Sequence, residues 1–244
     1  MANERLETSG LRAQCEQLPS VGPFAALSSA AAQAILPNLH HFDRDPGELI
    51  FQAGRPAEGL YIVSSGIVKL VQGTRDGARV YILDLRGRGD PLGEEALFSG
   101  CPYAASAKAI SATQLCYLPQ DDLEGVIRGH PDVALALMQT MAKRLVENHR
   151  ARVELAYDRS EARMARTVLR LMDRFGHRQN GHGALGLELS RTELAELLGL
   201  RPETAIRILS DWRHEGLVEL EERSLRVRDR ARLQERAGVA EGGA

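Results

Sequence analysis

Short apolar segments separated by turn residues dominate the chain between Asp45 and Tyr117. The segments are ELIF (48–51), LYIVSSGIVKLVQ (60–72), ARVYILDL (78–85) and ATQLCYLP (112–119), and ten glycines lie among them. Strands at such short intervals, with glycine turns and no ten-residue helical pattern between them, are typical of an antiparallel barrel or roll. We therefore expect a small β-roll in this part of the chain.

Helix-forming stretches bounded by proline or glycine lie on both sides of this region. They predict a short helix within residues 23–39 that Pro37 ends, and helices over 121–128, 131–157 and 160–174, with a glycine-rich turn at 175–183. Pro131 stands at a first helical position, where its missing N–H costs nothing. The chain is thus expected to pass from a roll into a helical half.

The long helix from Pro131 to about Tyr157 carries one narrow apolar stripe. Its members recur at spacings of three and four, with two polar interruptions: Met138, Met141, Leu145, Asn148, Arg152 and Leu155. A stripe this narrow over about seven turns resembles a coiled-coil seam, in which polar residues can fix register and pairing. We predict a parallel homodimer joined by this helix. The alternative is that the helix lies on its own roll.

The most informative stretch of the chain begins at Leu189. Its landmarks are a capping-box pattern, a turn glycine, a proline at a first helical position and a closing glycine: Ser190 with Glu193, Gly199, Pro202 and Gly216. These signals predict helices over 191–198 and 202–214 joined by a tight turn. Two short helices joined in this way are the helix-turn-helix pattern.

The residues of this motif divide into an inner and an outer set. The inner set, expected to form a shared core, is Leu194, Ala195, Leu198, Ala205, Ile208, Leu209 and Trp212. The outer set, at the start of the second helix, is Arg201, Glu203, Thr204 and Arg207. Arginine can donate twice to guanine and glutamate can accept from the cytosine amino group, so the outer set fits the reading of base edges. Glu203 and Arg207 can pair until DNA binds, because they are four residues apart.

Two alternating strands within residues 217–229 follow the second helix around a polar turn and predict a wing. The candidate phosphate contacts are Ser190, Arg191 and Thr192 at the first helix, and Arg226 and Arg228 on the wing. A symmetric dimer would place its two second helices roughly 34 Å apart, about one turn of duplex DNA. A helical hairpin that does not bind DNA is the alternative interpretation.

Composition and charge agree with this organisation. The 244 residues suffice for two domains, and 43% hydrophobic with 26% charged residues is close to the globular average. Residues 1–142 hold 11 Lys and Arg against 16 Asp and Glu, whereas residues 143–244 hold 20 against 17. The C-terminal part is therefore the expected anion binder.

The sequence also excludes several classes of protein. No stretch approaches 18 consecutive apolar residues and the N-terminus carries no export signal, so we expect no membrane insertion. Three cysteines without C-x-x-C spacing argue against a disulfide framework and for a reducing compartment, so we predict a cytoplasmic protein without a metal site. We find no P-loop, G-x-S-x-G or H-E-x-x-H motif and expect no catalysis. An enzyme and a protein-docking module are the rival hypotheses.

From about Phe24 to Asp229 the chain resembles the CRP/FNR superfamily of bacterial transcription regulators. The resemblance rests on PGELIFQAGRPAEGLYIVSSGIVKL (46–70), PLGEEALFSG (91–100), the long helix, and LSRTELAELLGLRPETAIRIL (189–209). It implies an α+β protein with a cyclic-nucleotide-binding-type β-roll, a long dimerisation helix and a C-terminal winged helix-turn-helix. The implied parts are an extension (1–22), the β-roll sensor domain (23–130), the dimerisation helix (131–157), the DNA-binding domain (158–232) and a flexible tail (233–244).

The resemblance also implies a function. The homodimer would bind a two-fold symmetric promoter site on double-stranded DNA and contact RNA polymerase, with residues 157–160 as the hinge that passes on a signal from the roll. The family's E-x-x-x-R signature falls on Glu203 and Arg207. Ile206 replaces the serine usual in FNR-type members, and Pro202 replaces the arginine usual in cyclic-AMP regulators. We predict a guanine-containing site, with activation and repression both open.

The roll departs from the cyclic-nucleotide members of the superfamily. In those members an Arg-Ser pair some ten residues after a Gly-Glu pair holds the phosphate. Gly93 and Glu94 are present here, but residues 96–107 contain no arginine. A phosphodiester would lose its strongest charge-assisted hydrogen bonds, so we predict that cyclic AMP does not bind.

Other sensor chemistry is also incomplete. FNR-type oxygen sensors hold an iron–sulfur cluster with three clustered N-terminal cysteines and a fourth in the roll. Cys116 falls on the fourth position and Cys15 lies near the positions of the other three, but two thiolates do not hold a cluster. We expect Cys116 to be a small buried hydrophobe and Cys101 a loop residue, with a redox role for either as the alternative. Haem or another small effector would need ligands such as His40 and His41, which precede the first expected strand, or His149. We predict no cofactor.

Overall fold

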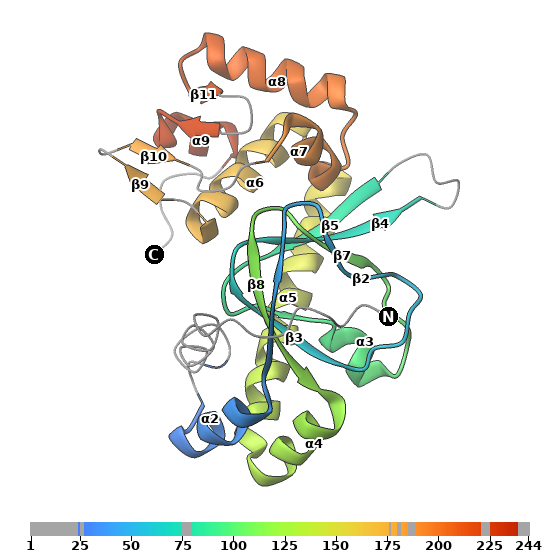
Figure 1. Cartoon of the computed structure of the whole chain (residues 1–244). Coiled ribbons are helices and arrows are strands. Elements are labelled where there is room, and N and C mark those ends of the chain that lie inside the picture. The colour runs from blue at the N-terminus through green and yellow to red at the C-terminus, as the bar shows by residue number, and fades with distance from the viewer. Residues whose placement is uncertain are drawn as a thin grey trace. The chain divides into compact units, whose positions relative to one another are not determined.

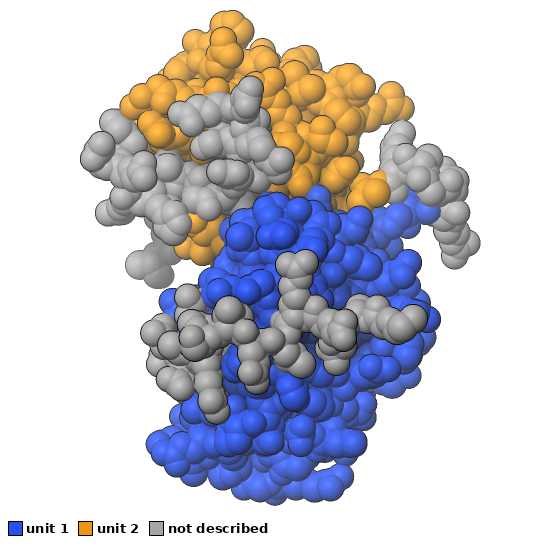
Figure 2. Space-filling model, in the orientation of Figure 1, with its two compact units in different colours: residues 1–79, 83–146 blue, residues 80–82, 147–244 orange. Residues whose placement is uncertain are grey.

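The computed structural model describes Phe24 and residues 27–74, 80–175, 177–179, 182–184, 189–220 and 225–238. The chain divides into two compact units, one of residues 1–79 and 83–146 and the other of residues 80–82 and 147–244 (Figures 1 and 2). We call them the first and the second unit. The division falls within the long helix α5 (Pro131–Tyr157), which contributes to both.

The first unit is a roll of two four-stranded sheets, with orders β1-β8-β3-β6 and β2-β7-β4-β5. Its strands are β1 (His40–Arg44), β2 (Leu49–Phe51), β3 (Gly59–Ser65), β4 (Val68–Gly73), β5 (Val80–Arg86), β6 (Pro91–Leu92), β7 (Ser106–Ala109) and β8 (Thr113–Pro119). Its helices besides α5 are α2 (Ser29–Ile35), the 3-10 turn η3 (Leu36–Asn38), α3 (Glu94–Ser99) and α4 (Gln120–Gly129). The predicted roll and its flanking helices are confirmed.

The core of the roll lies in two clusters. One gathers Leu60, Ile62, Cys116 and Leu118 from β3 and β8 with residues of α2, α4 and α5, and the other gathers Val63, Val68, Leu92, Ala107 and Leu115. The segment expected as one strand over residues 60–72 is two strands that turn at Gly66. Its φ is +84°, and an added Cβ would lie 2.4 Å from the Ala112 carbonyl oxygen, so only glycine fits there.

Three strands were not anticipated: β1, β6 and β7. His40 and His41 lie within β1, paired with Tyr117 and Cys116, and do not precede the first strand. Cys116 is fully buried, as expected, because β8 is covered on both sides. It is also disulfide-bonded, whereas the cysteine spacing argued against a disulfide framework.

The second unit continues the chain from the end of α5. Its helices are α6 (Ser160–Phe175), α7 (Arg191–Leu198), α8 (Pro202–His214) and α9 (Arg230–Arg236). Its strands β9 (His177–Gln179), β10 (His182–Ala184), β11 (Val218–Leu220) and β12 (Leu225–Val227) form one sheet of order β11-β12-β10-β9. The stretch predicted as a glycine-rich turn is therefore the β9–β10 hairpin, which β12 extends through backbone pairing with β10.

The described ranges contain neither a membrane-spanning helix nor a group of metal-ligating side chains. No helix there is both long and apolar enough to cross a membrane. Nor do those ranges contain a group of at least three His, Cys, Asp or Glu side chains that could hold a metal ion.

Candidate nucleic-acid interface

Helix α7 begins with the predicted capping box. The Ser190 hydroxyl accepts a hydrogen bond from the Glu193 backbone N–H at 3.1 Å, and the Ser190 N–H donates to a Glu193 carboxylate oxygen at 2.9 Å. At the other end Gly199 adopts φ +62°, and the N–H of Leu200 donates to the Ala195 carbonyl at 2.9 Å. Both ends are therefore fixed locally, which sets where α8 begins.

Helix α8 is held by the face that it buries. Ala205, Ile208, Leu209 and Trp212 are buried, as are Leu194, Ala195 and Leu198 of α7, so the predicted shared core is confirmed. The Trp212 indole N–H donates to Glu161 of α6 at 3.0 Å. Because an unpaired indole N–H would be costly in this core, the bond fixes how α8 is rotated on α6.

Helix α9 is also linked to Glu161 through a charged side chain. Arg236 of α9 donates to Glu161 and to Glu215, each at 2.7 Å. The hydrogen bond from Trp212 is the largest influence on Glu161, and together with Arg236 it lowers the pKa of that carboxyl. Helices α6, α8 and α9 are thereby connected through one carboxylate.

The opposite face of α8 is turned to solvent and carries the predicted base-reading set. Arg201, Glu203 and Arg207 are exposed, while Thr204 is partly buried at the flank. The predicted ion pair between Glu203 and Arg207 does not form in the described part of the structure. The Arg207 guanidinium lies 3.8 Å from an Asp211 carboxylate oxygen instead. Its side chain is still 71% exposed. The loose contact leaves the guanidinium available to a ligand.

The candidate phosphate contacts differ in their availability. Arg191 and Thr192 are exposed at the first turn of α7. The Ser190 hydroxyl is already engaged, because it donates to Glu193 at 2.8 Å. On the wing, Arg228 pairs with Glu219, and Arg226 lies 3.9 Å from the same carboxylate. Both wing arginines would therefore have to share or leave Glu219 to reach a phosphate.

The apolar stripe of α5 differs from the predicted seam. Met138, Leu145 and Leu155 are more than half exposed, Asn148 and Arg152 are exposed, and Met141 is partly buried. Three further exposed apolar residues were missed: Leu135, Val146 and Val153. They extend the face of Met138 and Leu145: Leu135 precedes Met138 by three residues, Met138 and Leu145 are seven residues apart, and Val146 and Val153 are seven residues apart. Val133, Ala136 and Leu137 are buried on the other face, which packs on the roll.

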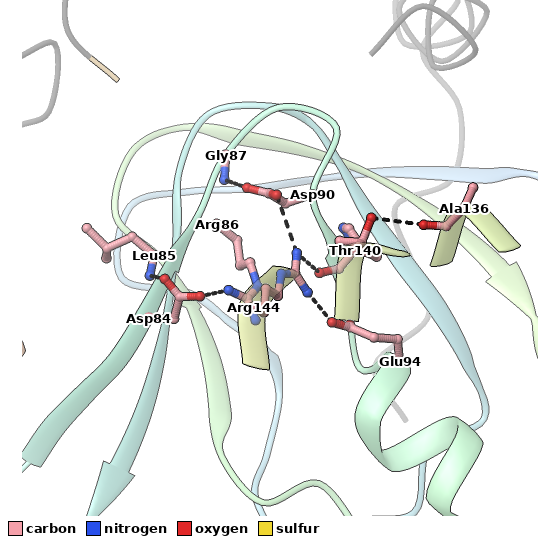
Figure 3. A network of polar contacts seen from close by, with 10 residues as sticks. Asp84, Leu85, Arg86, Gly87, Asp90, Glu94, Ala136, Thr140 and Arg144 are labelled. Atoms are coloured by element: carbon pink, nitrogen blue, oxygen red, sulfur yellow. Dashed lines mark hydrogen bonds and ion pairs between the residues drawn. The ribbon is translucent and has the colours of Figure 1, made fainter. Parts of the chain in front are cut away.

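A network of charged residues joins α5 to the roll (Figure 3). Arg144 of α5 pairs with Glu94, lies 3.3 Å from an Asp90 carboxylate oxygen and donates to the Pro91 carbonyl at 3.4 Å. Glu94 is only 2% exposed, and burial raises the pKa of its carboxyl although Arg144 and Arg86 act to lower it. Arg86 is itself buried and pairs with Asp84. The sequence pattern indicated Glu94 but not its pairing with Arg144, which is 50 residues away along the chain.

Two features of the described part of the roll bear on the prediction that it binds neither a cyclic nucleotide nor an iron–sulfur cluster. No arginine occurs in 96–107, where Tyr103 instead stacks on Phe51 with ring centroids 3.9 Å apart, and the Glu94 carboxylate is taken by Arg144. Of the described cysteines, Cys101 is exposed and Cys116 is disulfide-bonded, so these two offer no ligand pair for iron.

Each of the two units contains a segment that matches a known protein family. The cyclic nucleotide-binding domain family matches residues 43–130, and the Crp-like helix-turn-helix domain family matches residues 162–236. The chain is 31% identical to a CRP-like cAMP-activated global transcriptional regulator of Mycobacterium tuberculosis, over 91% of this chain and 99% of that protein. It is 34% identical to the cyclic AMP receptor protein of Thermus thermophilus, over 81% and 89% respectively.

The fold agrees with these relatives. A CRP/FNR-family transcriptional regulator of Thermus thermophilus superposes with a TM-score of 0.69 at 27% identity. The match covers 81% of this chain and 98% of that structure.

Proposed function

Because the chain belongs to the CRP/FNR family of transcription regulators, we propose that it acts as a homodimer that reads a two-fold symmetric DNA site with helix α8. One observation carries the proposal: Glu203 and Arg207 stand exposed on the outer face of α8 while the opposite face is locked into the core by Trp212. A helix held this rigidly can present side chains to the major groove without ordering itself at the moment of binding.

The chemistry of the outer face suits one G·C base pair. Arg207 can donate two hydrogen bonds to the O6 and N7 atoms of guanine, and Glu203 can accept from the N4 amino group of cytosine. Arg201 and Thr204 flank this pair, and Arg191 and Thr192 would position the helix by contacting phosphates. Arg226 and Arg228 would add wing contacts, at the expense of their bonds to Glu219.

The homodimer is supported by the exposed apolar stripe of α5. Leu135, Met138, Leu145, Val146 and Val153 would be covered by the same residues of a second copy, as in a two-stranded coiled coil. Each helix α8 would then enter one of two half-sites about 34 Å apart. A single copy would make only half of these contacts.

A signal from the roll would reach α8 through α5. Arg144 fixes α5 to the roll, and at the other end Glu154 lies 2.8 Å from Arg170 of α6. Arg163 also donates to the Leu155 carbonyl at 3.2 Å, across the segment that we propose as the hinge. Reorientation at residues 157–160 would have to break or exchange these bonds. We propose that the signal is not cyclic AMP, because the phosphate arginine is missing. We also propose that the bound dimer contacts RNA polymerase.

Selection of binding sites from a random duplex library tests the proposal. The expected product is an inverted repeat of guanine-containing half-sites whose centres lie about 10 base pairs apart. Affinity for the selected duplex should fall steeply with salt concentration, because phosphate contacts release counterions. Failure to enrich any sequence at low salt would contradict the proposal, as would a single asymmetric site bound by one copy.

A further inference from the structure

One apolar side chain stands on the outer face of α8. Ile206 is 41% exposed and lies three residues after Glu203 and one residue before Arg207. From residue 160 onward, no other large hydrophobic side chain that the structure describes is exposed. Among the described residues from 160 onward, Ile206 is therefore the one large apolar side chain turned to solvent, and it lies at the centre of the predicted base-reading set.

The position of Ile206 on the helix defines what it could touch. Residues three and four apart are neighbours on a helix surface, so Glu203, Ile206 and Ser210 form one row with Arg207 beside it. The inward residues Ala205 and Leu209 are buried, so the side chain of Ile206 cannot join the core without turning α8. Whatever covers Ile206 must come from outside and must lie next to the ligand of Glu203 and Arg207.

The major groove offers one apolar group at its floor, the 5-methyl group of thymine. Resting on the proposed function, we propose that Ile206 is a specificity-determining residue that contacts the 5-methyl group of a thymine next to the G·C pair read by Glu203 and Arg207. Contact removes the isoleucine and the methyl group from water together. A cytosine at that position would instead place its N4 amino group against the isoleucine, which cannot accept a hydrogen bond, so the amino group would lose its bond to water without a replacement.

The test replaces the methyl group and the side chain in turn. In the selected operator, each thymine adjacent to a conserved G·C pair is changed to deoxyuridine, which lacks only the methyl group. Affinities of the wild type and of Ile206→Ala are measured at one salt concentration. The wild type should lose about fourfold per half-site at one thymine, the equivalent of one buried methyl group. Ile206→Ala should bind the two duplexes equally.

A matched control is Leu83→Ala, which shortens an exposed apolar side chain of β5 in the roll. It should keep the wild-type sensitivity to deoxyuridine. The inference is overturned if the wild type ignores deoxyuridine at every thymine, if no thymine is selected beside the G·C pair, or if Ile206→Ala stays sensitive. In these cases an operator still exists, so the proposed function survives. If no duplex is selected at all, the proposed function fails and this inference fails with it.

Discussion

Glu94 is a carboxyl group that burial and a partner arginine influence in opposite directions. The side chain is almost completely buried beneath α5, and Arg144 lies against it. Burial raises the pKa of Glu94 above its ordinary value of 4.5, since the charged form loses its hydration, and Arg144 and Arg86 offset only part of this effect. The native state therefore holds the Glu94 proton more tightly than the unfolded state does.

This shift predicts a pH-dependent stability. The Glu94 contribution to the free energy of unfolding is fully present below pH about 4.5 and is lost as the pH rises through the folded-state pKa. Glu94→Gln does not titrate, so the stability of the wild type relative to this variant should decrease as the pH is raised. Urea unfolding between pH 4 and pH 8 measures the difference. The exposed neighbour variant Glu95→Gln should follow the wild type, and parallel curves for wild type and Glu94→Gln would contradict the assignment.

Ser190 shows how one residue positions an element. Its hydroxyl caps α7, and α7 in turn supports the start of α8. Ser190→Ala should lower the free energy of unfolding by about 1 kcal/mol, because the N–H of Glu193 loses its partner. Thr192→Ala, on the exposed side of the same turn, is the control and should change stability by less than about 0.5 kcal/mol. Denaturant unfolding measures both, and equal losses would argue against the cap.

The helix-turn-helix could be predicted because its signals are local. The capping box, the turn glycine and the proline of α8 each fix backbone conformation within a few residues. By contrast, β1 (HHFDR), β6 (PL) and β7 (SAKA) have no clear alternation, and they are strands because β8, β3 and β4 pair with them. Pairing between distant segments is not visible in a short window of sequence.

The stripe of α5 illustrates a second limit of periodicity. The spacing predicted a seam through Met141, but that residue is partly buried, and Val146 and Val153 are exposed in its place. Periodicity shows that a helix has apolar positions, but the roll determines which of them it covers. The Glu203–Arg207 pair failed for a similar reason, because Asp211 offers an alternative partner one turn further along α8.

At the scale of the whole molecule, the α5 stripe predicts association. Leu145→Glu places a charge at the centre of the proposed helix pair and should convert a dimer into a monomer of 26.8 kDa. Affinity for a two-fold symmetric operator should fall about 100-fold or more, because the two half-sites are no longer linked. Sedimentation equilibrium and anisotropy titration measure the two effects. Leu83→Glu is the control on an exposed apolar residue of the roll, and a Leu145→Glu dimer would contradict the seam.

The sequence of the roll predicts that this protein, unlike the relatives named for cyclic AMP, does not bind that nucleotide. Because residues 96–107 contain no arginine, we expect cyclic AMP to find no guanidinium partner for its phosphate there. Isothermal titration calorimetry should show no binding at micromolar nucleotide, and operator affinity should not change when cyclic AMP is added. A micromolar dissociation constant would show that another cation replaces the missing guanidinium group.

The central claim is that the outer face of α8 reads base edges, and Arg207 tests it most directly. Fluorescence anisotropy would compare wild type and Arg207→Ala on the selected duplex and on a scrambled duplex of the same length and salt concentration, with the exposed roll variant Arg128→Ala as control. We predict a loss of about 1 to 3 kcal/mol on the selected duplex and a much smaller loss on the scrambled one. Equal losses on both duplexes would mean that Arg207 contacts only the phosphate backbone and would contradict the account.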